Sequence, residues 1–111
     1  MNDGPRQFVD LFISDRFEFG KLRDLMASAA PDVRISISST MPEPGEQGAL
    51  DMLVLAGSGG GVLAAIRVIP EFLKARRTAI SITVKAKEKT VIVTASNVDE
   101  VMPIIERILD A

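Results

Sequence analysis

Residues 47–77 constrain the fold of this 111-residue chain more than any other stretch. Between Asp51 and Arg67 no side chain is charged, and four of the chain's eight glycines lie there. Such a stretch is the buried central element of a small domain, a membrane-seeking segment, or a glycine loop that binds phosphate. From Val62 to Arg77 the apolar residues form one stripe, which is typical of an amphipathic helix. We therefore expect residues 50–75 to form a central buried helix.

Glycine and proline should modify this central helix locally. Gly57, Gly59, Gly60 and Gly61 lack side chains, so we expect the sheet and another helix to pack closely against them. The helix is expected to be loosened or broken at the last three of these glycines, and a strand-loop-helix arrangement of the stretch is the alternative that stays open. Pro70 removes one helical hydrogen bond and should kink the second half.

Two other interpretations of the same stretch stay open. The charge-free span from Met52 to Ile66 has 15 residues, which as a helix reaches about 22 Å against a hydrocarbon core of roughly 30 Å. Several copies together are compatible with a small membrane-perturbing effector. Residues 59–64 also fit the pattern G-x-G-x-x-A, which would suit a weak nucleotide-binding module. No acidic residue follows at the spacing that ribose binding needs.

The rest of the chain alternates between strand and helix patterns. Period-two alternation predicts strands at residues 7–14, 33–38, 80–85 and 91–95, the last two forming a hairpin that turns near Lys87. Helices are expected after Asp15 and after Asn97, each residue starting a capping-box spacing. Ser36 and Ser38 should face water. We predict a single α+β domain over residues 1–111, with a flexible N-terminus at 1–6 and a Pro/Gly loop at 40–47.

These elements define the predicted architecture. Their order is βαβαββα, with the central apolar helix packed on a four-stranded mixed sheet. The first two strands are expected to be parallel, joined by a right-handed helical connection.

The composition argues against catalysis. The chain has no histidine, cysteine, tyrosine or tryptophan, so the commonest general base, nucleophile and metal ligands are missing. We predict no enzymatic activity, no catalytic residues, no cofactor and no metal site. A cysteine-free chain is compatible with the cytoplasm. A net charge of −2 gives no general attraction to nucleic acid.

Two surface segments are predicted to bind a partner. Pro42 and Pro44 stiffen the loop Met41–Glu46, and stiff loops lose little entropy on binding. Lys74, Arg76 and Arg77 form a basic rim, in which the arginines suit carboxylates. An ordinary solvated connection is the alternative for both segments.

Four successive motifs resemble the effector-associated constant component family of bacteria. They are Pro42-x-Pro44-Gly45-x-x-Gly48-Ala49-Leu50, Leu53-Val54-Leu55-Ala56-Gly57-Ser58-Gly59-Gly60, Phe72-Leu73-Lys74-Ala75-Arg76-Arg77 and Ile80-Ser81-Ile82-Thr83-Val84. The chain departs from the family in lacking a tryptophan before the basic pair. It also has Glu88-Lys89 where a glycine-containing turn is usual.

The resemblance implies a role in nucleotide-regulated bacterial conflict or immunity systems. Members are proposed to be invariant components encoded beside variable effectors such as peptidases. A non-catalytic adaptor is therefore expected, with a protein effector or a signalling NTPase of the same system as its partner. Oligomers are compatible with this role. The family supplies no catalytic or ligand residues for transfer to this sequence.

Overall fold

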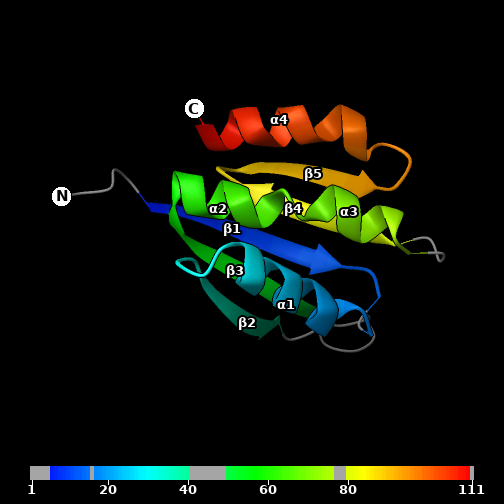
Figure 1. The fold of residues 1–111 in the computed structure, drawn as a ribbon, viewed down its shortest axis with the longest axis horizontal. Coiled ribbons are helices and arrows are strands. Elements are labelled where there is room, and N and C mark those ends of the chain that lie inside the picture. The colour runs from blue at the N-terminus through cyan, green and yellow to red at the C-terminus, as the bar shows by residue number, and fades with distance from the viewer. Residues whose placement is uncertain (1–5, 16, 41–49, 77–79, 111) are drawn as a thin grey trace.

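The computed structural model describes residues 6–15, 17–40, 50–76 and 80–110. In chain order (Figure 1) they form β1 (Arg6–Ile13), α1 (Phe19–Ala29), β2 (Arg34–Thr40), β3 (Leu50–Ser58), α2 (Gly59–Ile66), α3 (Ile69–Lys74), β4 (Ser81–Ala86), β5 (Lys89–Thr94) and α4 (Val98–Asp110). The predicted single α+β domain is confirmed. Residues 1–5 of the predicted flexible terminus lie outside the described residues, and Arg6 begins β1. Residues 41–47 of the predicted loop also lie outside them.

Five strands form one antiparallel sheet in the order β2-β3-β1-β4-β5. The predicted four-stranded mixed sheet is therefore wrong in strand number and in strand direction. The additional strand is β3, which we expected to be the first half of the central helix. It is apolar on both sides because it lies within the sheet between β2 and β1. The periodicity of such a short apolar run does not distinguish a strand from a buried helix.

The connections between strands explain why the sheet is antiparallel. β1 and β2 run in the same direction, as predicted, but β3 lies between them and pairs antiparallel with both. In the same way β1 lies between β3 and β4. Two interleaved split β-α-β units of this kind make the ferredoxin-like arrangement, here followed by β5 and α4. β3 occupies the position between β1 and β2, so these two parallel strands do not pair directly.

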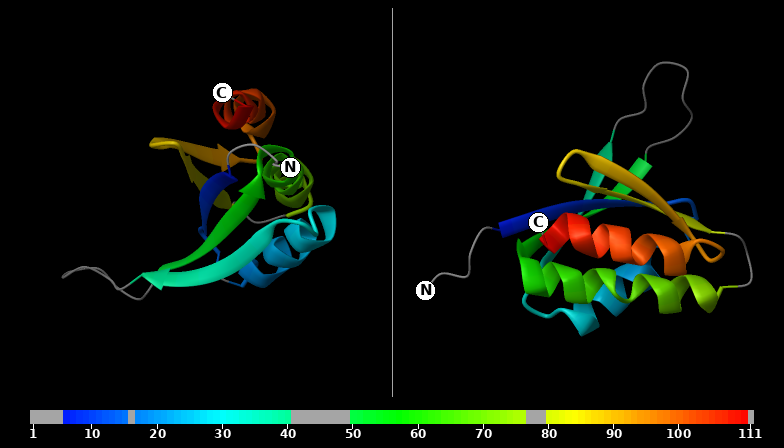
Figure 2. Two further views of the ribbon diagram at one scale, coloured as in Figure 1. Left: turned by 90° about the vertical axis from the view of Figure 1, so that its left-hand side faces the viewer. Right: turned by 90° about the horizontal axis from the view of Figure 1, so that it is seen from above.

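The helices lie on one side of the sheet, as the views in Figures 1 and 2 show. The core forms between this helix layer and alternate strand residues, and no polar or charged side chain is buried there among the described residues. Its fully buried strand and helix residues include Val9, Leu11, Leu53, Leu55, Ile82, Leu22, Met26, Ile66, Phe72 and Ile105. No helix of the described ranges lies on the opposite side of the sheet.

The central helical segment begins only after β3. The hydroxyl oxygen of Ser58 accepts the backbone N–H of Gly61 at 3.3 Å and caps the start of α2. Arg67 and Val68 separate α2 from α3, and Pro70 lies in the first turn of α3, where its missing N–H removes no helical bond. The predicted kink at Pro70 is thus present as a break between two helices.

Candidate docking surface

One face of the sheet is not covered by any described helix, and we call it the open face. The strand registers place on it Arg34, Ser36 and Ser38 of β2, Met52, Val54 and Ala56 of β3, Phe8, Asp10 and Phe12 of β1, Ser81, Thr83 and Lys85 of β4, and Thr90, Ile92 and Thr94 of β5. Successive side chains of a strand point to opposite faces, so these residues alternate with those of the core.

Large apolar side chains lie on this open face. Phe8 is 62% exposed and Ile92 is 57% exposed, while Phe12, Met52 and Val54 are half-buried. Met52 lies directly opposite Phe12 across the β1–β3 pair. Side chains opposite or diagonal to one another on neighbouring strands are in contact range, so Phe8, Phe12, Met52 and Val54 form one apolar area. In the register Thr83 lies between this area and Ile92.

Polar groups surround the apolar area. Lys85 lies opposite Asp10 in the register, and its ammonium nitrogen sits 5.1 Å from the centre of the Phe12 ring. Arg34 is also charged and exposed on the open face, and Ser36 on the same strand is exposed, as predicted for the serine face. A hollow of about 330 Å³ opens where β1 and β4 meet, between Phe12 and Lys85. An apolar centre with a polar margin is the usual composition of a protein-binding surface.

A second hollow, of about 530 Å³, lies at the end of the sheet and is lined by Ser14, Ser81, Thr94 and Ser96. Three of these hydroxyl groups, those of Ser14, Thr94 and Ser96, form hydrogen bonds within the protein. The hydroxyl of Ser14 accepts the backbone N–H of Ser81 at 3.0 Å, and the hydroxyls of Thr94 and Ser96 are 3.0 Å apart. The chain has no histidine that could activate one of these hydroxyls as a nucleophile.

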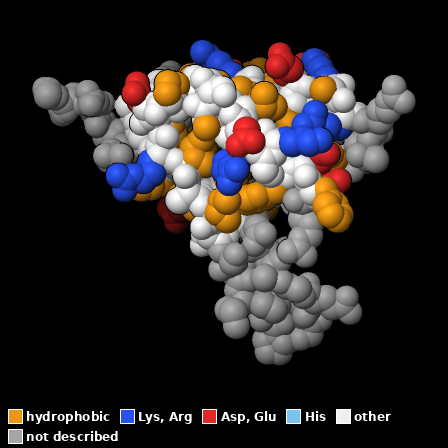
Figure 3. Space-filling model, turned by 60° about the horizontal axis from the view of Figure 1, so that its bottom comes forward, with side chains coloured by type: hydrophobic (Ala, Val, Ile, Leu, Met, Phe, Trp, Pro, Cys, Tyr) orange, Lys and Arg blue, Asp and Glu red, His pale blue; other side chains and the backbone are white. Residues whose placement is uncertain are grey.

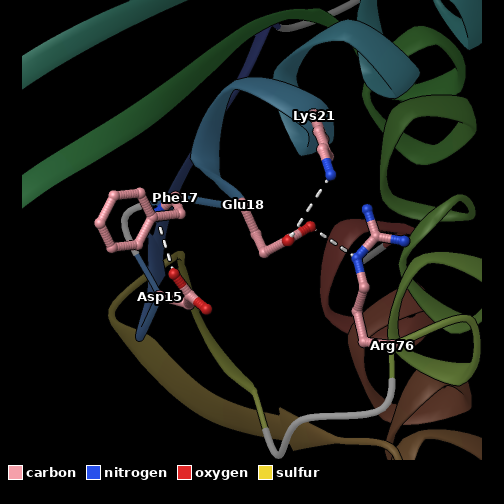
Figure 4. A network of polar contacts seen from close by, with 5 residues as sticks. All are labelled: Asp15, Phe17, Glu18, Lys21 and Arg76. Atoms are coloured by element: carbon pink, nitrogen blue, oxygen red, sulfur yellow. Dashed lines mark hydrogen bonds and ion pairs between the residues drawn. The ribbon is translucent and has the colours of Figure 1, made fainter.

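Lys74 and Arg76 of the predicted basic rim are bound within the molecule. Lys74 donates to both carboxylate oxygens of Asp99 at 2.9 and 3.2 Å, which ties α3 to α4. Arg76 lies beside Glu18 at the start of α1, with 2.7 Å between Nε and Oε1, as Figure 4 shows. Both side chains of this second pair are only 19% exposed. Arg77 lies outside the described residues, as do Pro42 and Pro44.

The contact between Arg76 and Glu18 is an ion pair rather than a hydrogen bond. The two atoms are close, but neither has a hydrogen-bond partner of acceptable geometry within the described part of the chain. The guanidinium carbon of Arg76 also lies 4.0 Å from the centre of the Phe72 ring, and Lys21 approaches Glu18 at 3.8 Å. The arrangement gives Arg76 a structural role between α3 and α1, while its predicted role in partner binding stays a prediction.

The four central glycines have different surroundings. A methyl group at Gly61 would come within 3.0 Å of the Val33 side chain, and one at Gly57 within 3.3 Å of the same side chain. At Gly60 a methyl group would meet nothing within 4 Å, and at Gly59 it would only touch Gln7 at 3.8 Å. Close packing therefore accounts for Gly57 and Gly61 and gives no reason for the other two.

The open face was not among the predicted binding surfaces. A signal for it was present in the first strand, where Phe8 and Phe12 alternate with the core residues Val9 and Leu11. Apolar residues on both sides of a strand mean either burial on both sides or one exposed apolar side. The choice depends on whether a second layer covers the sheet, and that follows only from the full topology.

No helix in the described ranges is long and apolar enough to cross a membrane.

The comparisons with known proteins identify one family. Neither the solved structures nor the curated proteins yielded a significant match. The family described as Effector Associated Constant Component 1 matches residues 20–109, which span α1 and nearly all of the elements that follow it. The resemblance seen in the sequence motifs is thus confirmed, and the chain belongs to the Effector Associated Constant Component 1 family.

Proposed function

We propose that this protein is a non-catalytic adaptor that binds a protein effector, or a signalling NTPase of the same system, through the open face. The observation that carries the proposal is the pair of exposed apolar anchors, Phe8 and Ile92, on a sheet face that no helix covers. Contiguous exposed apolar surface on a small protein marks an interaction site. The family name associates the chain with effectors, and a cytoplasmic location remains the prediction from its cysteine-free sequence.

A protein partner fits the open face better than a nucleic acid. Among the open-face side chains that the structure describes, Arg34 and Lys85 are the cations and Asp10 is the anion, so the phosphate contacts that dominate nucleic-acid binding have little support there. Aromatic anchors surrounded by hydroxyl groups are instead typical of the centre and rim of protein interfaces. Strands also hold these anchors in place before binding, so little conformational entropy is lost.

The non-catalytic part of the proposal rests on side-chain chemistry. The chain has no histidine, cysteine or tyrosine, and the hydroxyls of Ser14, Thr94 and Ser96 at the larger hollow bond to neighbouring backbone and hydroxyl groups. A serine or threonine nucleophile needs an adjacent base. The weak nucleotide-binding alternative is also less favoured, because Ser58 already accepts the N–H of Gly61 that a phosphate would use.

Site-specific cross-linking tests the proposal. A photoreactive phenylalanine analogue is placed at position 8, and a matched chain carries it at Phe17, which is 87% exposed but lies before α1, outside the sheet. Both are expressed in the native host, and the cross-linked products are identified by mass spectrometry. We expect a protein of the effector system to be captured from position 8 and not from position 17. Equal capture from both positions, or capture of lipid or nucleotide at position 8, contradicts the proposal.

A further inference from the structure

The two edge strands of the sheet, β5 and β2, differ in how their outer backbone groups are hydrogen-bonded. Along β5 the side-chain amide of Asn97 occupies the outer edge, because its Oδ1 accepts the N–H of Thr94 at 2.7 Å and its Nδ2 donates to the carbonyl of Ile92 at 3.1 Å. One side chain thereby takes the place of a neighbouring strand. The Asn97 side chain was predicted to cap the start of the C-terminal helix. It instead bonds to the backbone of β5. α4 also runs beside this edge (Figure 1).

The opposite edge, β2, has no such protection from the described part of the chain. Its seven residues pair with β3 in an unbroken register, so it contains no bulge, and it contains neither lysine nor proline. From Arg34 to Ser38 the backbone makes no hydrogen bond on the outer side to any described residue. Ile37 is 47% exposed and Ile35 is partly exposed on the helix side of this edge. Natural proteins normally block such an edge, because it pairs readily with another strand.

Hydrophobic side chains gather on this side of the molecule. Figure 3 brings the α1 and β2 side forward and shows hydrophobic side chains between scattered charges of both signs. No single charge sign dominates there, so electrostatic repulsion does not keep another copy of the chain away. A strand that pairs here would continue the sheet and cover the exposed isoleucine.

We propose that β2 pairs antiparallel with β2 of a second copy of this chain, with Ser36 at the two-fold axis. In a continuous sheet, opposite residues point to the same face. The register centred on Ser36 places Ile35 opposite Ile37 of the second copy, and Ile37 opposite Ile35. A register centred on Ile37 would leave Ile35 opposite Ser39, so the Ser36 register buries more apolar surface.

A second copy suits this edge better than an unrelated extended peptide. The strand is self-complementary in the proposed register, because isoleucine faces isoleucine on one side and Ser36 faces its own copy on the other. Its charged side chain, Arg34, then lies opposite Ser38 and meets no like charge. The resulting sheet joins two five-stranded sheets and presents two open faces side by side. Such an arrangement would bind a paired partner with avidity.

Sedimentation analysis and a single introduced cysteine test this pairing. The full chain has no cysteine, so Ser36→Cys creates one thiol that should oxidise to a disulfide-linked dimer across the axis, since opposite Cβ atoms in a sheet are close enough. Ser28→Cys on α1, also exposed, is the matched control and should stay monomeric on a denaturing gel. The wild type should sediment as a dimer, and Ile37→Lys should weaken the dimer by roughly tenfold or more.

Three results would overturn the proposal: a monomeric wild type at all concentrations, a dimer that Ile37→Lys leaves unchanged, or equal disulfide yields from Ser36→Cys and Ser28→Cys. Circular dichroism and the melting temperature verify that each variant is folded. The inference goes beyond the adaptor function and does not depend on it. Phe8→Ser should leave the dimer intact, so failure of pairing and failure of partner binding are separable.

Discussion

The two faces of the sheet come from the same strands in alternation, yet they have different roles. Leu11 is 1% exposed beneath the helices, while Phe8, three residues earlier on β1, is 62% exposed on the open face. The helix layer accounts for the whole hydrophobic core, so the apolar residues of the open face are not needed to hold the fold together. The comparison indicates that stability and partner binding are assigned to opposite sides of one sheet.

Truncating one residue on each face is the strongest way to break this comparison. Leu11→Ala should lower the free energy of unfolding by about 3 kcal/mol, because it leaves a cavity in the packed core. Phe8→Ser should lower it by about 0.5 kcal/mol or less, since that side chain is already in water. Urea denaturation measures both values. Similar losses for the two variants would mean that the open face belongs to the core.

Two ion pairs that join helical segments, Arg76 with Glu18 and Lys74 with Asp99, should differ in the same way. Arg76→Gln should lower the free energy of unfolding by about 1 to 2 kcal/mol, because it leaves the buried Glu18 oxygen without its main counter-charge. Lys74→Gln should cost only about 0.3 kcal/mol, since its pair with Asp99 is exposed. Thermal or urea unfolding of the two variants measures both changes in the free energy of unfolding. An equal effect would show that burial does not set the strength of these contacts.

Two neighbouring glycines sharpen the comparison on a smaller scale. Gly60→Ala should stabilise the protein by about 0.5 kcal/mol, because the site is open and alanine favours a helix. Gly61→Ala should be about 1 kcal/mol less stable than Gly60→Ala, since its methyl group meets Val33. Adding Val33→Ala should remove most of that difference, which a double-mutant cycle measures. If the stability difference between Gly61→Ala and Gly60→Ala persists in the Val33→Ala background, a contact other than Val33 causes it.

Much of the fold followed from the sequence because most segments have one clear periodicity. The hairpin of β4 and β5 and the C-terminal helix were predicted near their observed positions. The turn between the strands uses Lys87 and Glu88 at positive φ angles of 51° and 66°, although glycine or asparagine usually supplies such angles. Here the alternating apolar residues on both sides, rather than the turn sequence, indicated the hairpin.

The strand β3 was assigned to the central helix because its residues are apolar on both sides of the strand. Leu53 and Leu55 face the helices, while Met52 and Val54 lie on the open face, so the run shows no alternation of apolar and polar residues. The glycines after it were then assigned to the same helix. Once β3 is known, the open face can be worked out from register alone, but no local pattern reveals which face the helices leave uncovered.

Two residues of the predicted basic rim, Lys74 and Arg76, form ion pairs within the protein that the sequence did not indicate. Lys74 and Arg76 looked like a free basic rim because their acidic partners, Asp99 and Glu18, are far away in the sequence. Such pairs form only through the packing of α3 against its neighbours. The loop of Pro42 and Pro44 lies outside the described residues, and its role in partner binding stays a prediction.

The affinity of the captured partner for open-face variants tests the central claim most directly. Isothermal titration calorimetry compares the wild type with Phe8→Ser and Ile92→Ser, and with Phe17→Ser as the control of equal chemistry away from the sheet. We expect both open-face variants to weaken binding by about tenfold or more, as loss of interface anchors does, while the control binds like the wild type. Affinities within about twofold of the wild type for both open-face variants, with unchanged melting temperatures, would contradict the account.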